Sequence, residues 1–156
     1  LYLKPKYEEL DRISNILAKE KIDFVKLLKG GITRDDPTYK FYANLYKITD
    51  RAHYMAVQPA LWKKKSLQKV YEKTNVSHIR EFENAASSVC FREEIRGIYS
   101  YSGEPKVGLY HYASRTYPYI ATAISAGKWN TKEYRKELMR LSREYETDLQ
   151  ERGTND

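Results

Sequence analysis

The stretch PALWKKKSLQKVYEKT, residues 59–74, gathers the side chains best suited to chemistry in this chain. It holds five lysines and one glutamate among a tryptophan, a tyrosine, two leucines and a valine, so it contributes a net charge of +4 to the chain's +7. Ammonium groups attract phosphates, and the counterions that a nucleic acid releases on binding drive the association. The segment therefore indicates non-specific contact with a polyanion.

Helical spacing aligns the charged side of this segment. Trp62, Lys65, Lys69 and Lys73 follow one another at intervals of 3, 4 and 4 residues. Like charges four residues apart repel in an isolated helix, and phosphates would relieve that repulsion. The alternative is a lysine run that faces solvent while Trp62 covers an edge of the core.

A second basic stripe lies in the first predicted helix, opposite its apolar side, and it is the weaker of the two because Glu8 and Asp11 share its edge. Solvated surface is again the alternative interpretation. The two stripes together give the candidate nucleic-acid contacts, which are Arg12, Lys19, Lys26, Trp62, Lys63, Lys65, Lys69 and Lys73.

The charge comes without a base-reading motif. The sequence has no zinc-finger spacing, no basic zipper and no strand-borne aromatic motif for RNA. A helix-turn-helix over residues 37–74 stays open as an alternative. Phosphate contact without sequence readout is the direct expectation.

No set of residues has the spacing of an active site or metal site. His53, His78 and His111 lie far apart in the sequence, and no glycine-rich phosphate loop or nucleophile elbow is found. The single cysteine, Cys90, excludes an internal disulfide and lies among apolar residues, which favours a buried, inert thiol. We expect no enzyme activity, no catalytic residue, no metal, no cofactor and no small-molecule substrate.

Apolar periodicity predicts helices along most of the chain. A first helix is expected over residues 5–29, a second from Asp36 to about Gln58, and a third over 59–74. A fourth begins at Asn75 or Ser77 and stops at Gly97, a short one lies between Thr116 and Gly127, and the last begins at Asn130 and ends at Gly153.

The fold class predicted from these elements is all-α, a bundle of four to six helices in one domain over residues 1–156. Residues 1–30 form either a helix of that bundle or an extended N-terminal arm. Tyrosines alternate around a Ser-Gly-Glu-Pro turn in GIYSYSGEPKVGLYHY, residues 97–112. That stretch is either a small β-hairpin or an ordered loop. No segment approaches the length of a membrane span, and the start at Leu1 instead of methionine indicates that residues have been removed.

A small, basic, tyrosine-rich, mostly helical chain without a catalytic cluster resembles the major coat proteins of filamentous and rod-shaped archaeal viruses. The resemblance covers the whole chain as an architecture and is not carried by a motif. It implies a structural virion protein, assembled in the host cytoplasm, that sheathes double-stranded DNA in a helical filament. It also implies a homo-oligomer, or a hetero-dimer with a related coat protein.

Two other functions remain as alternatives. One is a cellular helix-turn-helix regulator that binds nucleic acid at a specific sequence. The other is an all-helical adaptor that binds a protein and whose lysines are merely solvated.

Overall fold

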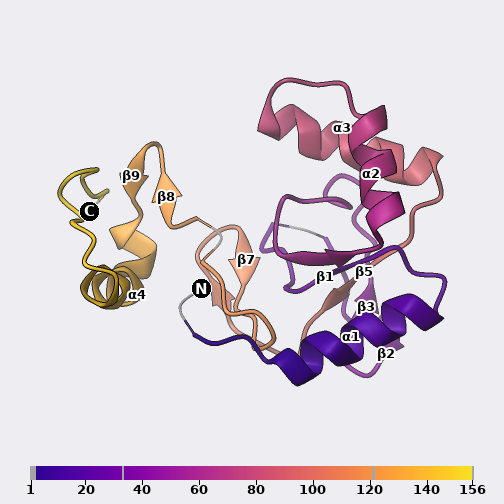
Figure 1. Cartoon of the computed structure of the whole chain (residues 1–156), viewed down its shortest axis with the longest axis horizontal. Coiled ribbons are helices and arrows are strands. Elements are labelled where there is room, and N and C mark those ends of the chain that lie inside the picture. Colours follow the sequence, from indigo (N-terminus) through magenta and orange to yellow (C-terminus); the bar gives the residue numbers. More distant parts are fainter. Residues whose placement is uncertain (1–2, 33, 121, 156) are drawn as a thin grey trace.

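The computed structural model, which describes residues 3–32, 34–120 and 122–155, is built around a five-stranded mixed sheet (Figure 1). Its strands are β1 (Phe24–Lys26), β2 (Lys40–Tyr42), β3 (Leu45–Lys47), β4 (Ala60–Trp62) and β5 (Gly97–Ser100). They lie in the order β2-β3-β5-β1-β4. The central pair, β1 and β5, is parallel, while β4 runs antiparallel to β1 with Trp62 opposite Phe24.

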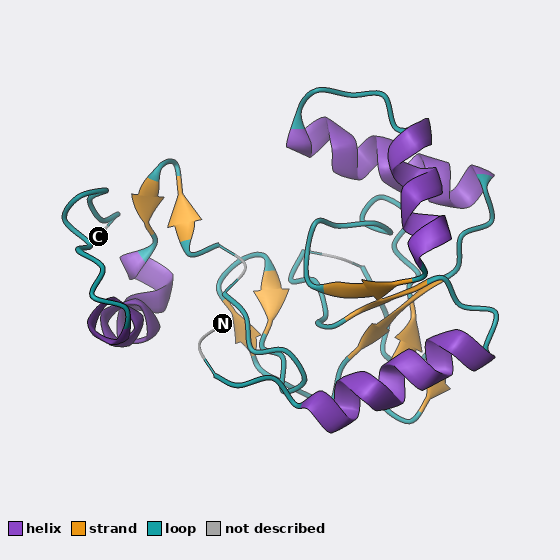
Figure 2. Cartoon of the chain, in the orientation of Figure 1, coloured by secondary structure: helices purple, strands orange, loops and turns teal. Residues whose placement is uncertain are grey.

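Helices cover both faces of this sheet (Figure 2). On one face, α1 (Tyr7–Lys19) packs Ile13 and Leu17 against Val25 and Ile98. On the other face, α2 (Lys64–Lys73) and α3 (Ile79–Arg92) cover a core that contains Phe24 and Tyr99. Successive residues of a strand point to opposite faces, which explains how β1 contributes to both cores.

The central strand pair needs a glycine where β5 begins. A Cβ atom at Gly97 would overlap the ring of Phe24, so only glycine lets β5 lie this close to the aromatic side chain. The contact places the end of α3 beside the start of β1.

The C-terminal third has a core of its own, made by Ile120, Tyr134, Leu138 and Leu149. It contains β6 (Lys106–Val107), β7 (His111–Tyr112), β8 (Ile124–Ser125), β9 (Lys128–Trp129) and α4 (Thr131–Glu144). The two strand pairs are separate antiparallel hairpins. Residues 110–116 tie this part to the sheet domain, for example through the 2.6 Å hydrogen bond that the Ser114 hydroxyl donates to the Leu27 carbonyl. No helix in the described part of the chain has the length and apolar character to cross a membrane.

The all-α prediction is wrong, because the protein is an α/β fold. The predicted first helix ends at Lys19, and the residues after it enter β1. Phe24 and Val25 are both buried, since β1 is covered on its two faces. A strand buried on both faces shows no alternation, so its apolar residues extended the helical pattern.

The predicted second helix is replaced by a β-hairpin and a long connection. Tyr42 pairs with Leu45, and Ala43 at the turn has a φ of 41°. The spacing of apolar residues between Phe41 and Met55 was therefore coincidental, and the many aromatic residues there were a strand signal. Because residues 40–47 form strands, the helix-turn-helix predicted over 37–74 does not form.

Of the third predicted helix, residues 59–74, only 64–73 are helical, as α2, because Ala60–Trp62 form β4. The fourth helix is confirmed as α3 and the last as α4, which ends at Glu144 instead of near Gly153. Asn130 is the N-cap of α4, and its side-chain amide donates to Glu133 at 3.2 Å.

The two alternatives for residues 97–112 both missed the central strand. β5 pairs with β1 and β3, and the small hairpin in this region is β6–β7. The short helix predicted between Thr116 and Gly127 is absent from the described residues of that range. There the chain forms the β8–β9 hairpin, whose turn residues Ala126 and Gly127 have φ of 49° and 80°.

Candidate nucleic-acid interface

Three segments that carry six cationic side chains are joined at the start of α2, and we call these six residues the basic corner. Two come from the end of α1 and the turn after it, three from the junction of β4 and α2, and one from the loop before β5. Its members are Lys19, Lys21, Lys63, Lys64, Lys65 and Arg96. All are exposed except Lys63, which is half-buried.

Hydrogen bonds through Asp23 hold the three segments of the basic corner together. The Lys63 amide donates to the Asp23 carbonyl at 2.8 Å. One carboxylate oxygen of Asp23 accepts from the Ser66 hydroxyl at 2.5 Å, and the other accepts from the Arg96 amide at 2.9 Å. The Lys63 ammonium group also donates to the Glu20 carbonyl at 3.0 Å. The carboxylate of Asp23 is thus engaged by an uncharged hydroxyl and a backbone amide.

The basic corner keeps most of its positive charge. Residues 19–23, residues 63–66 and Arg96 contain six cations and two acids, Glu20 and Asp23, a net charge of +4, and the acids Glu93 and Glu94 precede Arg96 in its loop. Within the described part of the chain, Lys19, Lys21, Lys64 and Lys65 form no salt bridge. The first turn of α2 holds no acidic residue, and its N-cap makes no side-chain capping bond. The positive end of the helix dipole therefore adds to the lysine charge.

The other end of α2 is neutralised by α3. The carboxylate of Glu93 accepts from Lys69 at 2.8 Å and from Lys73 at 2.7 Å. The hydrogen bonds from Lys69 and Lys73, of which the first has the larger effect, lower the pKa of Glu93 to about 2. The repulsion between these two lysines is offset within the protein, so it no longer argues for an external polyanion, and their contact with nucleic acid stays a prediction.

Three further candidates are occupied inside the molecule. Arg12 forms a bidentate pair with Glu9, in which its Nε donates at 2.7 Å. Lys26 lies on β1 and is 1 % exposed, so the prediction that it faces a ligand is wrong. Its ammonium group donates to the His53 carbonyl at 2.8 Å, and burial lowers its pKa. Trp62 stacks on Phe24 with ring centroids 4.1 Å apart.

The structure therefore brings together Lys19, Lys63 and Lys65 among the predicted residues. The missed members are Lys21, Lys64 and Arg96. Lys64 could have been included, because it lies within the same run of three lysines. Lys21 and Arg96 become neighbours of that run only through the pairing of β1 with β4 and β5.

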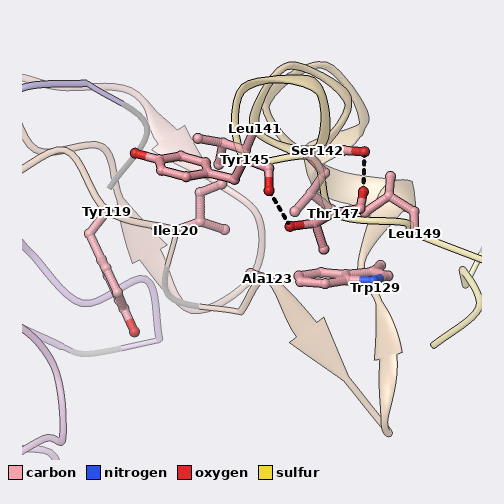
Figure 3. Close-up of a pocket in the computed structure, with 10 residues that line it drawn as sticks. Tyr119, Ile120, Ala123, Trp129, Leu141, Ser142, Tyr145, Thr147 and Leu149 are labelled. Carbon is pink, nitrogen blue, oxygen red and sulfur yellow. Dashed lines mark hydrogen bonds between the residues drawn. The ribbon is translucent and has the colours of Figure 1, made fainter. Parts of the chain in front are cut away.

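An apolar pocket of about 400 Å³ lies in the C-terminal part, between α4, the β8–β9 hairpin and the chain before it (Figure 3). Ser142 and Thr147, two of its polar residues, bond to neighbouring carbonyls at 2.6 and 3.4 Å. None of the residues that line it is acidic, basic or a cysteine. They are Tyr119, Ile120, Ala123, Trp129, Leu138, Leu141, Ser142, Tyr145, Thr147 and Leu149. The pocket offers shape and apolar surface, and its polar side-chain groups are hydroxyls and the Trp129 indole N–H.

Metal-binding side chains are not clustered among the described residues. Those residues contain no cluster of three or more histidine, cysteine, aspartate or glutamate residues that could hold a metal ion. Cys90 is buried, and this burial raises the pKa of its thiol to about 12, so the reactive thiolate is suppressed. Comparisons with protein-family models, with curated proteins and with solved structures found no match to this chain.

Proposed function

We propose that this protein binds nucleic acid through its phosphates, without reading sequence, and that the basic corner is the contact surface. The observation that carries the proposal is the joining of three segments that carry six cations, four of them exposed lysines without an ion-pair partner in the described chain. Double-stranded DNA is the partner that we propose to test first.

Folding brings these lysines together against their mutual repulsion. The Lys63 ammonium group is fixed at the turn after α1, and Asp23 anchors the start of α2 and the Arg96 backbone. The backbone of the three segments is therefore already ordered before a row of phosphates binds, although, of the corner's lysine side chains, only that of Lys63 is held by a hydrogen bond to another described residue. Each phosphate contact releases counterions, so several weak contacts give useful affinity without contact to the bases.

Assembly as a virion coat protein stays a prediction. The resemblance behind it was to an all-helical architecture, and the α/β sheet of this structure adds no support to it. A filament would form from copies of this chain on DNA, and electron microscopy of the mixture would reveal it.

Titration of two duplexes of unrelated sequence over a range of salt concentrations tests the proposal. We expect equal affinities for the two duplexes, and a plot of log affinity against log salt with a slope of about −4 to −5 for four to six phosphate contacts. A protein that binds neither duplex at about 50 mM salt contradicts the proposal. Preference for one duplex contradicts the absence of sequence readout.

A further inference from the structure

A shallow groove runs beside the C-terminal end of α3, and we call it the Phe91 groove. Its functional groups are an exposed aromatic ring, two guanidinium groups, a hydroxyl and an amide, which belong to Phe91, Arg51, Arg92, Ser88 and Asn84. None of these residues was a sequence-predicted contact, and none belongs to the basic corner.

The ring of Phe91 packs on a neighbouring aromatic ring and remains partly exposed. It packs on Tyr54 with ring centroids 4.6 Å apart, yet Phe91 remains 41 % exposed. Tyr54 is itself held, because its hydroxyl donates to the Ile95 carbonyl at 3.1 Å and accepts from the Gly97 amide at 2.8 Å. The exposed ring is therefore a rigid apolar surface that folding does not bury.

The guanidinium group of Arg51 lies over the Phe91 ring, so an incoming base would stack on this guanidinium plane or on the part of the ring that it leaves exposed. The guanidinium carbon of Arg51 lies 5.2 Å from the centroid of the Phe91 ring, within the range of a cation–π contact. Flat aromatic and guanidinium planes are the surfaces on which unpaired bases stack.

The remaining groups suit the other parts of a nucleotide. Asn84, Ser88 and Arg92 follow one another at intervals of four residues, so they lie along one side of α3. The Ser88 hydroxyl donates to the Asn84 backbone carbonyl, which leaves the exposed Asn84 side chain for a base edge. The Arg92 side chain is 63 % exposed, and its Nε lies 3.7 Å from a Glu93 carboxylate that Lys69 and Lys73 already engage.

The groove lies next to the basic corner along the chain. Arg92 precedes Arg96 by four residues, and a tight bend joins them. In that bend the Ile95 amide donates to the Cys90 carbonyl at 2.8 Å, and Glu94 has a φ of 54°. Glu93, whose carboxylate Lys69 and Lys73 engage, and Glu94 lie between Arg92 and Arg96, so a strand bound at both places would pass these two acids.

We propose that the Phe91 groove stacks an unpaired base of the nucleic acid whose phosphates bind the basic corner. The inference rests on the proposed function and narrows it to nucleic acids that expose bases, such as single strands or frayed ends. A fully paired duplex would use the corner alone.

Two single strands with the same number of phosphates test this inference. One is an oligothymidine of about 20 nucleotides, longer than the site of a typical single-strand-binding fold, and the other is an abasic deoxyribose-phosphate strand of equal length. We expect the wild type to bind the base-containing strand about 5- to 100-fold more tightly, the range for one stacked base. Phe91→Ala should bring that ratio close to one while the salt dependence of binding stays unchanged.

Two further variants distinguish the loss of the aromatic ring in the groove from a general loss of stability. Phe91→Leu retains an apolar side chain but has no aromatic plane, so it should also lose the preference. Tyr39→Ala removes an aromatic residue of similar exposure outside the groove and should keep the wild-type ratio. Equal wild-type affinity for both strands, or an unchanged ratio in Phe91→Ala, overturns the inference and leaves phosphate binding intact. Failure to bind either strand or duplex DNA overturns the proposed function itself.

Discussion

The two ends of α2 have the same residue type but different surroundings. At the C-terminal end, Lys69 and Lys73 share the Glu93 carboxylate at 2.8 and 2.7 Å. At the N-terminal end, Lys64 and Lys65 make no such pair within the described chain and lie beside the cations of two other segments. The helix therefore separates lysines that stabilise the fold from lysines that are available to a ligand.

This difference shows that a run of charge is not by itself a binding site. An ion pair offsets part of the charge that a phosphate would meet, and a ligand must break or share that pair. Lysines without an internal partner keep their full attraction. Nucleic-acid binding is thus proposed for the N-terminal end of α2, whereas the lysines at its C-terminal end pair with α3.

The largest effect is expected from reversing charge in the basic corner. The double change Lys64→Glu and Lys65→Glu should weaken duplex DNA binding about 10- to 100-fold at low salt, because two phosphate contacts become repulsive. Both side chains are exposed, so the thermal midpoint should change little. Fluorescence anisotropy and a melting curve measure the two quantities, and unaltered DNA affinity would rule out the corner as the contact surface.

A smaller and opposite effect is expected at the other end of the helix. Glu93→Gln removes the carboxylate that holds Lys69 and Lys73, so both become available to phosphates. DNA affinity should rise a few-fold and the salt slope should steepen by about one to two. The same variant should unfold at a lower temperature because it loses two ion pairs. A fall in DNA affinity would mean that Glu93 supports the interface instead of shielding it.

The pH dependence of stability should show the effect of the ion pairs that Glu93 makes with Lys69 and Lys73. The pKa of Glu93 is lowered in the folded state from its ordinary 4.5 to about 2. A lowered carboxylate pKa stabilises the folded state above the unfolded-state pKa, and this contribution is lost as the pH falls from 4.5 towards 2. The free energy of unfolding should thus decrease over that interval, and less steeply in Glu93→Gln. Equal slopes for the two proteins would contradict the ion-pair geometry.

The smallest effect on binding is expected at Trp62, which directly precedes the basic corner but is stacked on Phe24. Trp62→Phe should change DNA affinity by less than about twofold, because no phosphate contact is lost. It should cost stability of about 1 kcal/mol through reduced packing. Anisotropy and chemical denaturation measure the two effects, and a tenfold loss of affinity in a stable variant would place this ring at the interface.

Sequence patterns found the amphipathic helices but not the sheet that positions the site. The narrow apolar stripe of α4 and the charged side of α2 can be predicted because helical periodicity is local. β1 could not, because Phe24 and Val25 are buried on opposite faces and show no alternation. Without β1 the fold class was wrong, and Lys26 was placed on a surface instead of in the core.

Only part of the candidate site could be predicted from the sequence, because the rest depends on contacts between distant segments. The run from Lys63 to Lys65 is visible in the sequence, whereas Glu93 lies 20 residues from Lys73 and meets it only through the packing of α2 on α3. Arg96 joins the site through a hydrogen bond to Asp23, 73 residues away. Such pairings depend on the tertiary fold, so local sequence patterns do not predict them.

The salt dependence of duplex binding by two matched double variants tests the division of α2 most directly. Lys64→Gln with Lys65→Gln, and Lys69→Gln with Lys73→Gln, remove the same charge from the same helix. We predict that the slope of log affinity against log salt becomes shallower by about two for the first pair and stays unchanged for the second. Equal losses in the two variants, or a loss confined to the second, would contradict the account.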